Sequence, residues 1–79
     1  MERWKTIKGF QGSYKVSNYG HVKSFKRNKD GILLKVKCKQ NREYVVLKDR
    51  NHPSQKYYIY ILMRQYFPGE HYQDFKSKF

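Results

Sequence analysis

The sequence is poor in acidic residues and contains one cysteine. Only 6 of its 79 residues are Asp or Glu, against 18 Lys and Arg, so the formal net charge is +12. The lone Cys38 excludes an internal disulfide framework and gives no sign of an oxidising compartment. No apolar run approaches the roughly 20 residues that span a bilayer, and residues 1–5 lack the apolar segment of a signal peptide. We therefore expect a cytoplasmic protein with no membrane partner.

The length and composition indicate one small domain, residues 1–79, with a thin core. Aromatic residues make up 18% of the chain, and their large buried area helps a small domain that has few aliphatic side chains. The surplus of positive charge repels itself and favours an anionic partner. Charge alone would suit a membrane surface, an acidic protein or a nucleic acid.

Hydrophobic spacing predicts an α+β fold, a small antiparallel β-meander of four to five short strands followed by one amphipathic C-terminal helix. Short alternating segments separated by Gly, Asn and Asp turns are typical of such strands; they lie at residues 13–17, 21–25, 32–39, 43–48 and 55–59. From Ile59 the apolar spacing becomes helical and continues to Phe67, just before Pro68. We expect a sheet-plus-helix core over residues 3–68 and a polar tail over residues 69–79.

The segment 34–39 alternates apolar and basic residues. In one continuous strand, alternate side chains point to opposite faces. The expectation is therefore an apolar side facing the core and a cationic row on the other side; the apolar residues are Leu34, Val36 and Cys38, and the basic ones are Lys35, Lys37 and Lys39. A row of lysines is either a phosphate-contacting ridge or an ordinary solvated face, and the net charge favours the first.

Further candidates for nucleic-acid contact lie around the first hairpin and the turns; they are Lys15, Asn18, His21, Lys23, Lys26, Arg27 and Arg42. The two arginines can form bidentate contacts with phosphate or guanine, although each is equally well read as a free surface residue. Turn formation by itself explains Asn18. Core packing is the simpler interpretation of four aromatic residues, Trp4, Phe10, Tyr14 and Tyr44.

The histidines do not form a recognisable catalytic or metal-binding pattern. His21, His52 and His71 each stand singly in a turn or in the tail, and none has an acidic residue or a second His at ligand spacing beyond chance. Catalysis of phosphodiester cleavage at a metal needs a base together with several metal ligands. We therefore expect no catalytic residue, no metal site and no cofactor.

Residues 4–24 read W-K-x-I-K-G-F-Q-G-x-Y-K-V-S-N-x-G-H-V-K-S. They resemble the signature W-x-x-I-x-G-[FY]-E-G-x-Y-x-V-S-N-x-G-R-V-[RK]-S of the nuclease-associated modular DNA-binding family, type four, a module at the N-terminus of phage and intron HNH homing endonucleases. Weaker similarity at residues 42–47 and 59–67 extends the match over roughly residues 3–68. The family's His-Arg pair falls on Tyr60 and Ile61 here, its turn arginine falls on His21, and no HNH catalytic core follows.

The resemblance implies a small basic phage-type DNA-binding protein, not an enzyme, that contacts the phosphates of duplex DNA through a Lys- and Arg-rich sheet face. One alternative is a phage-encoded inhibitor of a host DNA-handling protein, such as a nuclease, a polymerase, a sliding clamp or a CRISPR effector. Electrostatic complementarity steers such an encounter as readily as it steers DNA. Another alternative is a truncated homing endonuclease subunit that works with a separate chain.

Overall fold

The computed structural model describes residues 1–69. In this part of the chain, seven short strands precede one helix: β1 Trp4–Thr6, β2 Tyr14–Ser17, β3 Val22–Ser24, β4 Ile32–Leu33, β5 Lys37–Lys39, β6 Arg42–Leu47, β7 Gln55–Tyr58 and α1 Ile59–Tyr66. The α+β class and the C-terminal helix are confirmed, while the strands are shorter and more numerous than expected. Beyond Gly69, the predicted tail lies outside the described residues.

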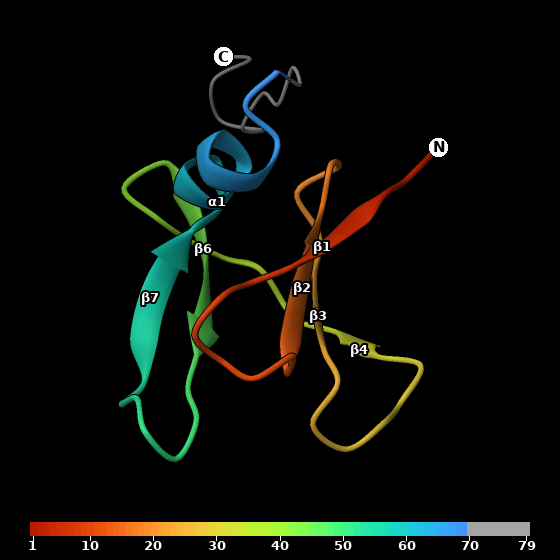
Figure 1. The fold of residues 1–79 in the computed structure, drawn as a ribbon. Helices are drawn as coiled ribbons and strands as arrows, with labels where there is room; N and C mark the ends of the chain where they lie inside the picture. Colours follow the sequence, from red (N-terminus) through yellow and green to blue (C-terminus); the bar gives the residue numbers. More distant parts are fainter. Residues whose placement is uncertain (70–79) are drawn as a thin grey trace.

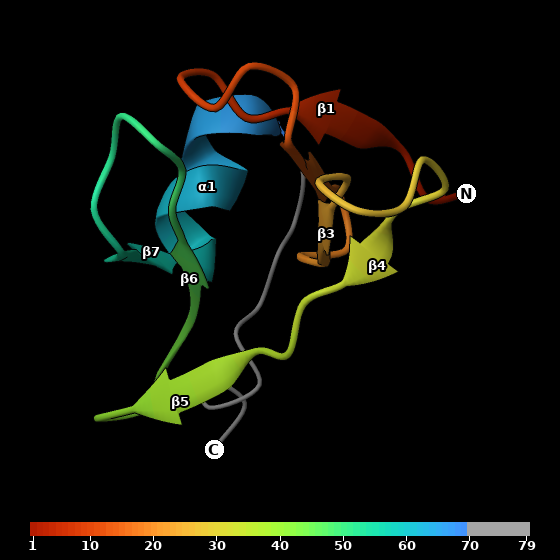
Figure 2. The same ribbon diagram turned by 90° about the horizontal axis from the view of Figure 1, so that it is seen from below.

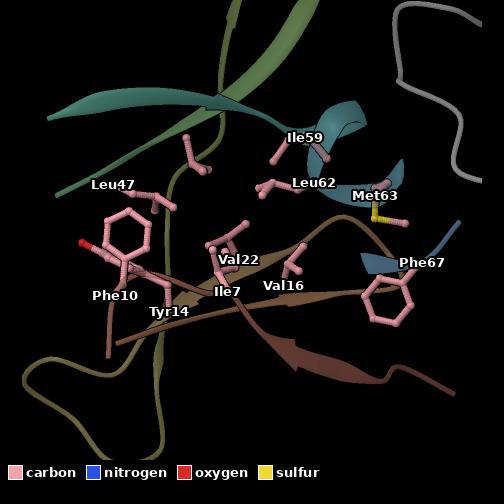
Figure 3. Close-up of a cluster of buried hydrophobic side chains, with 11 residues drawn as sticks. Ile7, Phe10, Tyr14, Val16, Val22, Leu47, Ile59, Leu62, Met63 and Phe67 are labelled. Carbon is pink, nitrogen blue, oxygen red and sulfur yellow. The ribbon is translucent and has the colours of Figure 1, made fainter. Parts of the chain in front are cut away.

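The strands form two antiparallel sheets, ordered β1-β2-β3-β4 and β5-β6-β7. The two sheets stand on either side of a shared core, and α1 closes one end of the space between them (Figure 1). Eleven buried side chains fill this space (Figure 3), and they are Ile7, Phe10, Tyr14, Val16, Val22, Val45, Leu47, Ile59, Leu62, Met63 and Phe67. The helix contributes its buried stripe to this core, as its spacing predicts.

Two turns contain residues with positive φ. Gln40 and Asn41 both have positive φ, 54° and 64°, between the paired residues Lys39 and Arg42. Two such residues in succession match the right-handed twist of the flanking strands, so β5 and β6 form a tight hairpin. Gly31 has φ 85°, and a Cβ there would lie 2.7 Å from a ring carbon of Phe25. Only glycine fits this position.

Residues 32–39 do not form one strand, contrary to the sequence prediction. Residues 32–33 pair with β3 as β4, whereas residues 37–39 pair with β6 as β5, and the chain crosses between the sheets in the intervening segment. Figure 2 shows β5 extending away from the first sheet. Since no layer formed by residues 1–69 covers β5, Cys38 is exposed and Val36 is 36% exposed, so neither is the core residue predicted; Leu34 does pack against the core.

The aromatic residues divide between the core and the outer faces. Phe10 and Tyr14 are buried as expected, and the Tyr14 hydroxyl donates to the carbonyl of Lys48 at 3.0 Å, which ties the two sheets together. Trp4 and Tyr44 are only half-buried and lie on outer faces, so their assignment to the core is wrong. The described residues contain no helix that is both long and apolar enough to span a membrane.

Candidate nucleic-acid interface

The outer face of the second sheet carries a cluster of cations and tyrosines. Directly paired residues of antiparallel strands share a face, and the register pairs Lys37 with Tyr44, Tyr44 with Tyr58, Lys39 with Arg42, and Val46 with Lys56. Val45 of β6 points the other way, into the core. We call this surface, with two residues of α1, the basic tyrosine face; it comprises Lys37, Lys39, Arg42, Tyr44, Val46, Lys56, Tyr58, Tyr60 and Arg64.

The tyrosine rings of this face lie next to one another and next to its cations. Ring centroids of Tyr44 and Tyr58 are 6.0 Å apart, and those of Tyr58 and Tyr60 are 6.1 Å apart. The Lys56 ammonium lies 5.2 Å from the Tyr44 ring centroid. At these distances, each cation is attracted to the electron-rich face of a ring, so the rings restrain the charged groups.

The ring of Tyr60 lies near one arginine of the second sheet and one arginine of α1. The guanidinium of Arg42, at the start of β6, lies 5.6 Å from the Tyr60 ring centroid, and that of Arg64, one helical turn further on, lies 5.9 Å from it. Two positively charged groups therefore lie near the same aromatic ring. Neither guanidinium forms an ion pair within residues 1–69, and Glu43 occupies the opposite face of β6. The arrangement leaves both arginines able to take an anion.

The first sheet holds a separate pair of the predicted residues. Lys15 and Lys23 lie directly opposite each other on neighbouring strands. The Lys23 ammonium is 4.6 Å from the Trp4 ring centroid, and the Lys15 ammonium is 5.2 Å from that of Phe25. The predicted candidates therefore fall on two different sheets.

The remaining predicted lysine and arginine candidates lie in connecting segments. Lys35 is exposed between β4 and β5, so only Lys37 and Lys39 of the predicted row share a strand. Arg27 is exposed in the loop after β3. The Lys26 ammonium donates a hydrogen bond to the carbonyl of Lys48 and lies 5.1 Å from the Tyr14 ring centroid, so it braces the fold.

Asn18 and His21 connect the first hairpin to the N-terminal segment. The Asn18 side-chain oxygen accepts a hydrogen bond from the backbone N–H of Arg3 at 2.6 Å, which supports its interpretation as a structural turn residue. His21 Nδ1 lies 2.6 Å from a Glu2 carboxylate oxygen. Hydrogen bonds from Ser17 and then from His21 hold the pKa of Glu2 below its ordinary value, against an opposing effect of burial.

His52 also has an acidic partner, which the sequence did not reveal. Its Nδ1 lies 2.8 Å from Asp49 Oδ1, so the expectation of solitary histidines is wrong for both His21 and His52. Burial raises the pKa of Asp49, but hydrogen bonds from His52 and from the backbone of Asn51 outweigh it, and the pKa is lowered overall. Residues 1–69 contain no cluster of three or more His, Cys, Asp or Glu side chains able to hold a metal. His71 lies outside the described residues.

Sequence reasoning missed part of the basic tyrosine face, namely Tyr44 as a surface residue together with Lys56, Tyr58, Tyr60 and Arg64. Two signals could have found them. The alternation of residues 43–48, paired antiparallel with residues 55–58, places Tyr44, Lys56 and Tyr58 on the solvent side. The spacing of four between Tyr60 and Arg64 places them on one helix face.

The model of the NUMOD4 motif matches residues 2–61, and the chain belongs to this family, which confirms the resemblance seen in residues 4–24. Among solved structures, the chain is similar to one described as "DNA binding and cleavage by the HNH homing endonuclease I-HmuI", with 30% identity and a TM-score of 0.68. The match covers 82% of this chain and 36% of that one, so the chain spans about a third of that protein's length. A comparison with curated proteins found no match.

Proposed function

We propose that this chain is a non-catalytic DNA-binding module that contacts the phosphates of duplex DNA through the basic tyrosine face. The observation that carries the proposal is the gathering of five cations and three half-buried tyrosines on the outer face of the second sheet and the adjoining part of α1. The cations are Lys37, Lys39, Arg42, Lys56 and Arg64. Concentrated positive charge repels itself in the free protein, and a polyanion relieves that repulsion.

The β5-β6 hairpin suits entry into a groove. A two-stranded ribbon fits the major groove of B-DNA, and here the ribbon ends in the two-residue turn of Gln40 and Asn41. Lys37 and Lys39 project from the same side of β5 and act as point charges toward phosphates, which position a protein without reading sequence. Arg42, beside the turn, carries the planar fork that suits a phosphate or a guanine.

The comparisons support this assignment. The matched structure is described as one of DNA binding and cleavage, and the part of it that resembles this chain is about a third of its length. We infer binding and not cleavage for residues 1–69, because lysine, arginine and tyrosine side chains hold phosphates but supply no metal ligand set. The proposal extends to a phage-type protein, which rests on the family resemblance, and to the cytoplasm of the host cell, which rests on the sequence composition.

The proposal is tested by mobility shift of a short DNA duplex at increasing salt. If five phosphates are neutralised, log K should fall with log salt at a slope of about −4.5, from about −0.9 per phosphate. Reversing two charges of the ribbon, Lys37→Glu with Lys39→Glu, should weaken binding strongly and leave circular dichroism unchanged. The matched control makes the same change of net charge at two exposed loop residues, Lys8→Glu with Arg50→Glu. A flat salt response, or equal losses in both double variants, would show that this face is not the interface.

A further inference from the structure

The first sheet presents a second cationic surface that the basic tyrosine face does not include. Lys15 and Lys23 are direct cross-strand neighbours, a placement that is unfavourable for like charges. The rings of Trp4 and Phe25 lie against the two ammonium groups. We call this set of four residues the hairpin lysine face.

Few carboxylates offset the charge of the hairpin lysine face. Glu2, whose carboxylate acts electrostatically on Lys23, is already engaged by His21 and Ser17. The loop that follows Phe25 adds exposed Arg27 and Lys29, against one exposed acid, Asp30. The surface therefore stays basic and able to bind an anion.

The two basic faces point in opposite directions. Val16 and Val22 alternate with Lys15 and Lys23 on the first sheet and are fully buried. Their side chains point toward the second sheet, where Leu47 faces them across the core (Figure 3). Lys15 and Lys23 must therefore point away from the second sheet. On β6, alternation turns the basic tyrosine face away from the first sheet in the same manner.

A single short duplex cannot reach both faces. DNA has a persistence length of about 50 nm, so a duplex of some 24 base pairs behaves as a rod and does not wrap around a small domain. When one such duplex lies on the basic tyrosine face, the hairpin lysine face stays accessible on the other side. Both faces place Lys or Arg against aromatic rings, and this shared chemistry argues for the same class of ligand, a nucleic-acid phosphate backbone.

We propose that the hairpin lysine face binds a second DNA duplex, so that one domain bridges two duplexes. This inference rests on the proposed function, since it takes the basic tyrosine face as the site of the first duplex. The second contact depends on Lys15 and Lys23, with Trp4 and Phe25 as positioning residues that restrain the two ammonium groups.

The test is a bridging assay with the full chain. A biotinylated 24-base-pair duplex is fixed on beads, a fluorescent duplex of unrelated sequence is added, and the captured fluorescence is measured with and without protein. Wild-type protein should capture the second duplex. The variant Lys15→Gln with Lys23→Gln should still shift one duplex in a gel but reduce capture to background. The same neutralisation at two loop residues, Lys8→Gln with Arg50→Gln, serves as the matched control and should retain capture.

Each other outcome has a definite meaning. If wild-type protein shifts a duplex but captures no second one, the bridging inference is overturned while the proposed function stands. If no duplex is shifted at all, the proposed function itself fails. If the Lys15 and Lys23 variant still captures the second duplex, bridging comes from self-association or from another surface, and the assignment of the hairpin lysine face is wrong. Circular dichroism of each variant confirms that its fold is intact.

Discussion

Tyr60 should control the affinity for DNA although it carries no charge. Its ring lies within 6 Å of two guanidinium groups, those of Arg42 and Arg64. Replacing Tyr60 with Leu removes the ring and leaves both charges in place. Each freed arginine must then be ordered when DNA binds, which costs about 0.5–1.5 kcal/mol per long side chain. The expected loss is about 1–3 kcal/mol, or roughly fivefold to 140-fold in Kd, because each 1.4 kcal/mol corresponds to about tenfold.

The assay is fluorescence anisotropy with a labelled duplex across a salt series. Tyr60→Leu should raise Kd without changing the salt slope, since no phosphate contact loses its charge. Arg42→Gln with Arg64→Gln should instead make the slope shallower by about 1.8, from about 0.9 per contact. Tyr60→Phe keeps the ring and should bind as wild type does. The reasoning is refuted if Tyr60→Leu binds normally, or if Tyr60→Phe loses as much affinity as Tyr60→Leu.

Three further predictions concern stability and catalysis. Val45 is fully buried, whereas Val36 is 36% exposed. Val45→Asp should therefore lower the free energy of unfolding by more than about 4 kcal/mol and unfold the domain. Val36→Asp should leave the domain folded, and chemical denaturation of the two variants checks this difference. The pKa of Asp49 is lowered in the folded state. Its contribution to stability is therefore present above the ordinary pKa of Asp and is lost as the pH falls through the lower pKa of the folded state. The difference in melting temperature between wild type and Asp49→Asn should shrink only in that acidic window. With Mg²⁺ or Mn²⁺ the chain should not nick supercoiled plasmid, and nicking that disappears in His52→Ala or His71→Ala would contradict this.

Local patterns predict the fold well wherever a second layer of the structure covers the segment. Tyr14 and Val16 alternate with Lys15 and are buried as the spacing predicts, because the second sheet and α1 lie against them. The helix from Ile59 behaves in the same way. The pattern fails for Cys38, which has the right spacing for a core residue but lies on a strand whose three residues are all exposed. Alternation shows which side chains share a face, but only tertiary packing decides whether that face is buried.

The candidate site likewise contains some contacts that follow from local spacing and others that depend on tertiary packing. Lysines 37 and 39 could be placed together from sequence because their contact is local to one strand. The placement of Arg42 and Arg64 around the Tyr60 ring could not be predicted from sequence, because it depends on the direction in which α1 continues from the end of β7. Tyr58 ends the strand and Tyr60 lies in the first turn of the helix, yet their rings stay 6.1 Å apart. The change from strand to helix therefore extends the face of the sheet onto α1, which spacing rules for either element alone do not describe.

The interruption of the strand at residues 34–36, which made the core prediction wrong, also has a consequence for binding. A single strand over residues 32–39 would have kept the lysine row against the first sheet, with one side buried. Instead, β5 crosses to the second sheet and extends beyond the core, with all three of its residues exposed (Figure 2). A ribbon that enters a groove meets nucleic acid on both of its faces and at its tip. In the proposed mode of binding, the exposure of β5 among residues 1–69 would let the turn of Gln40 and Asn41 enter a groove, with the lysines of the ribbon at its walls.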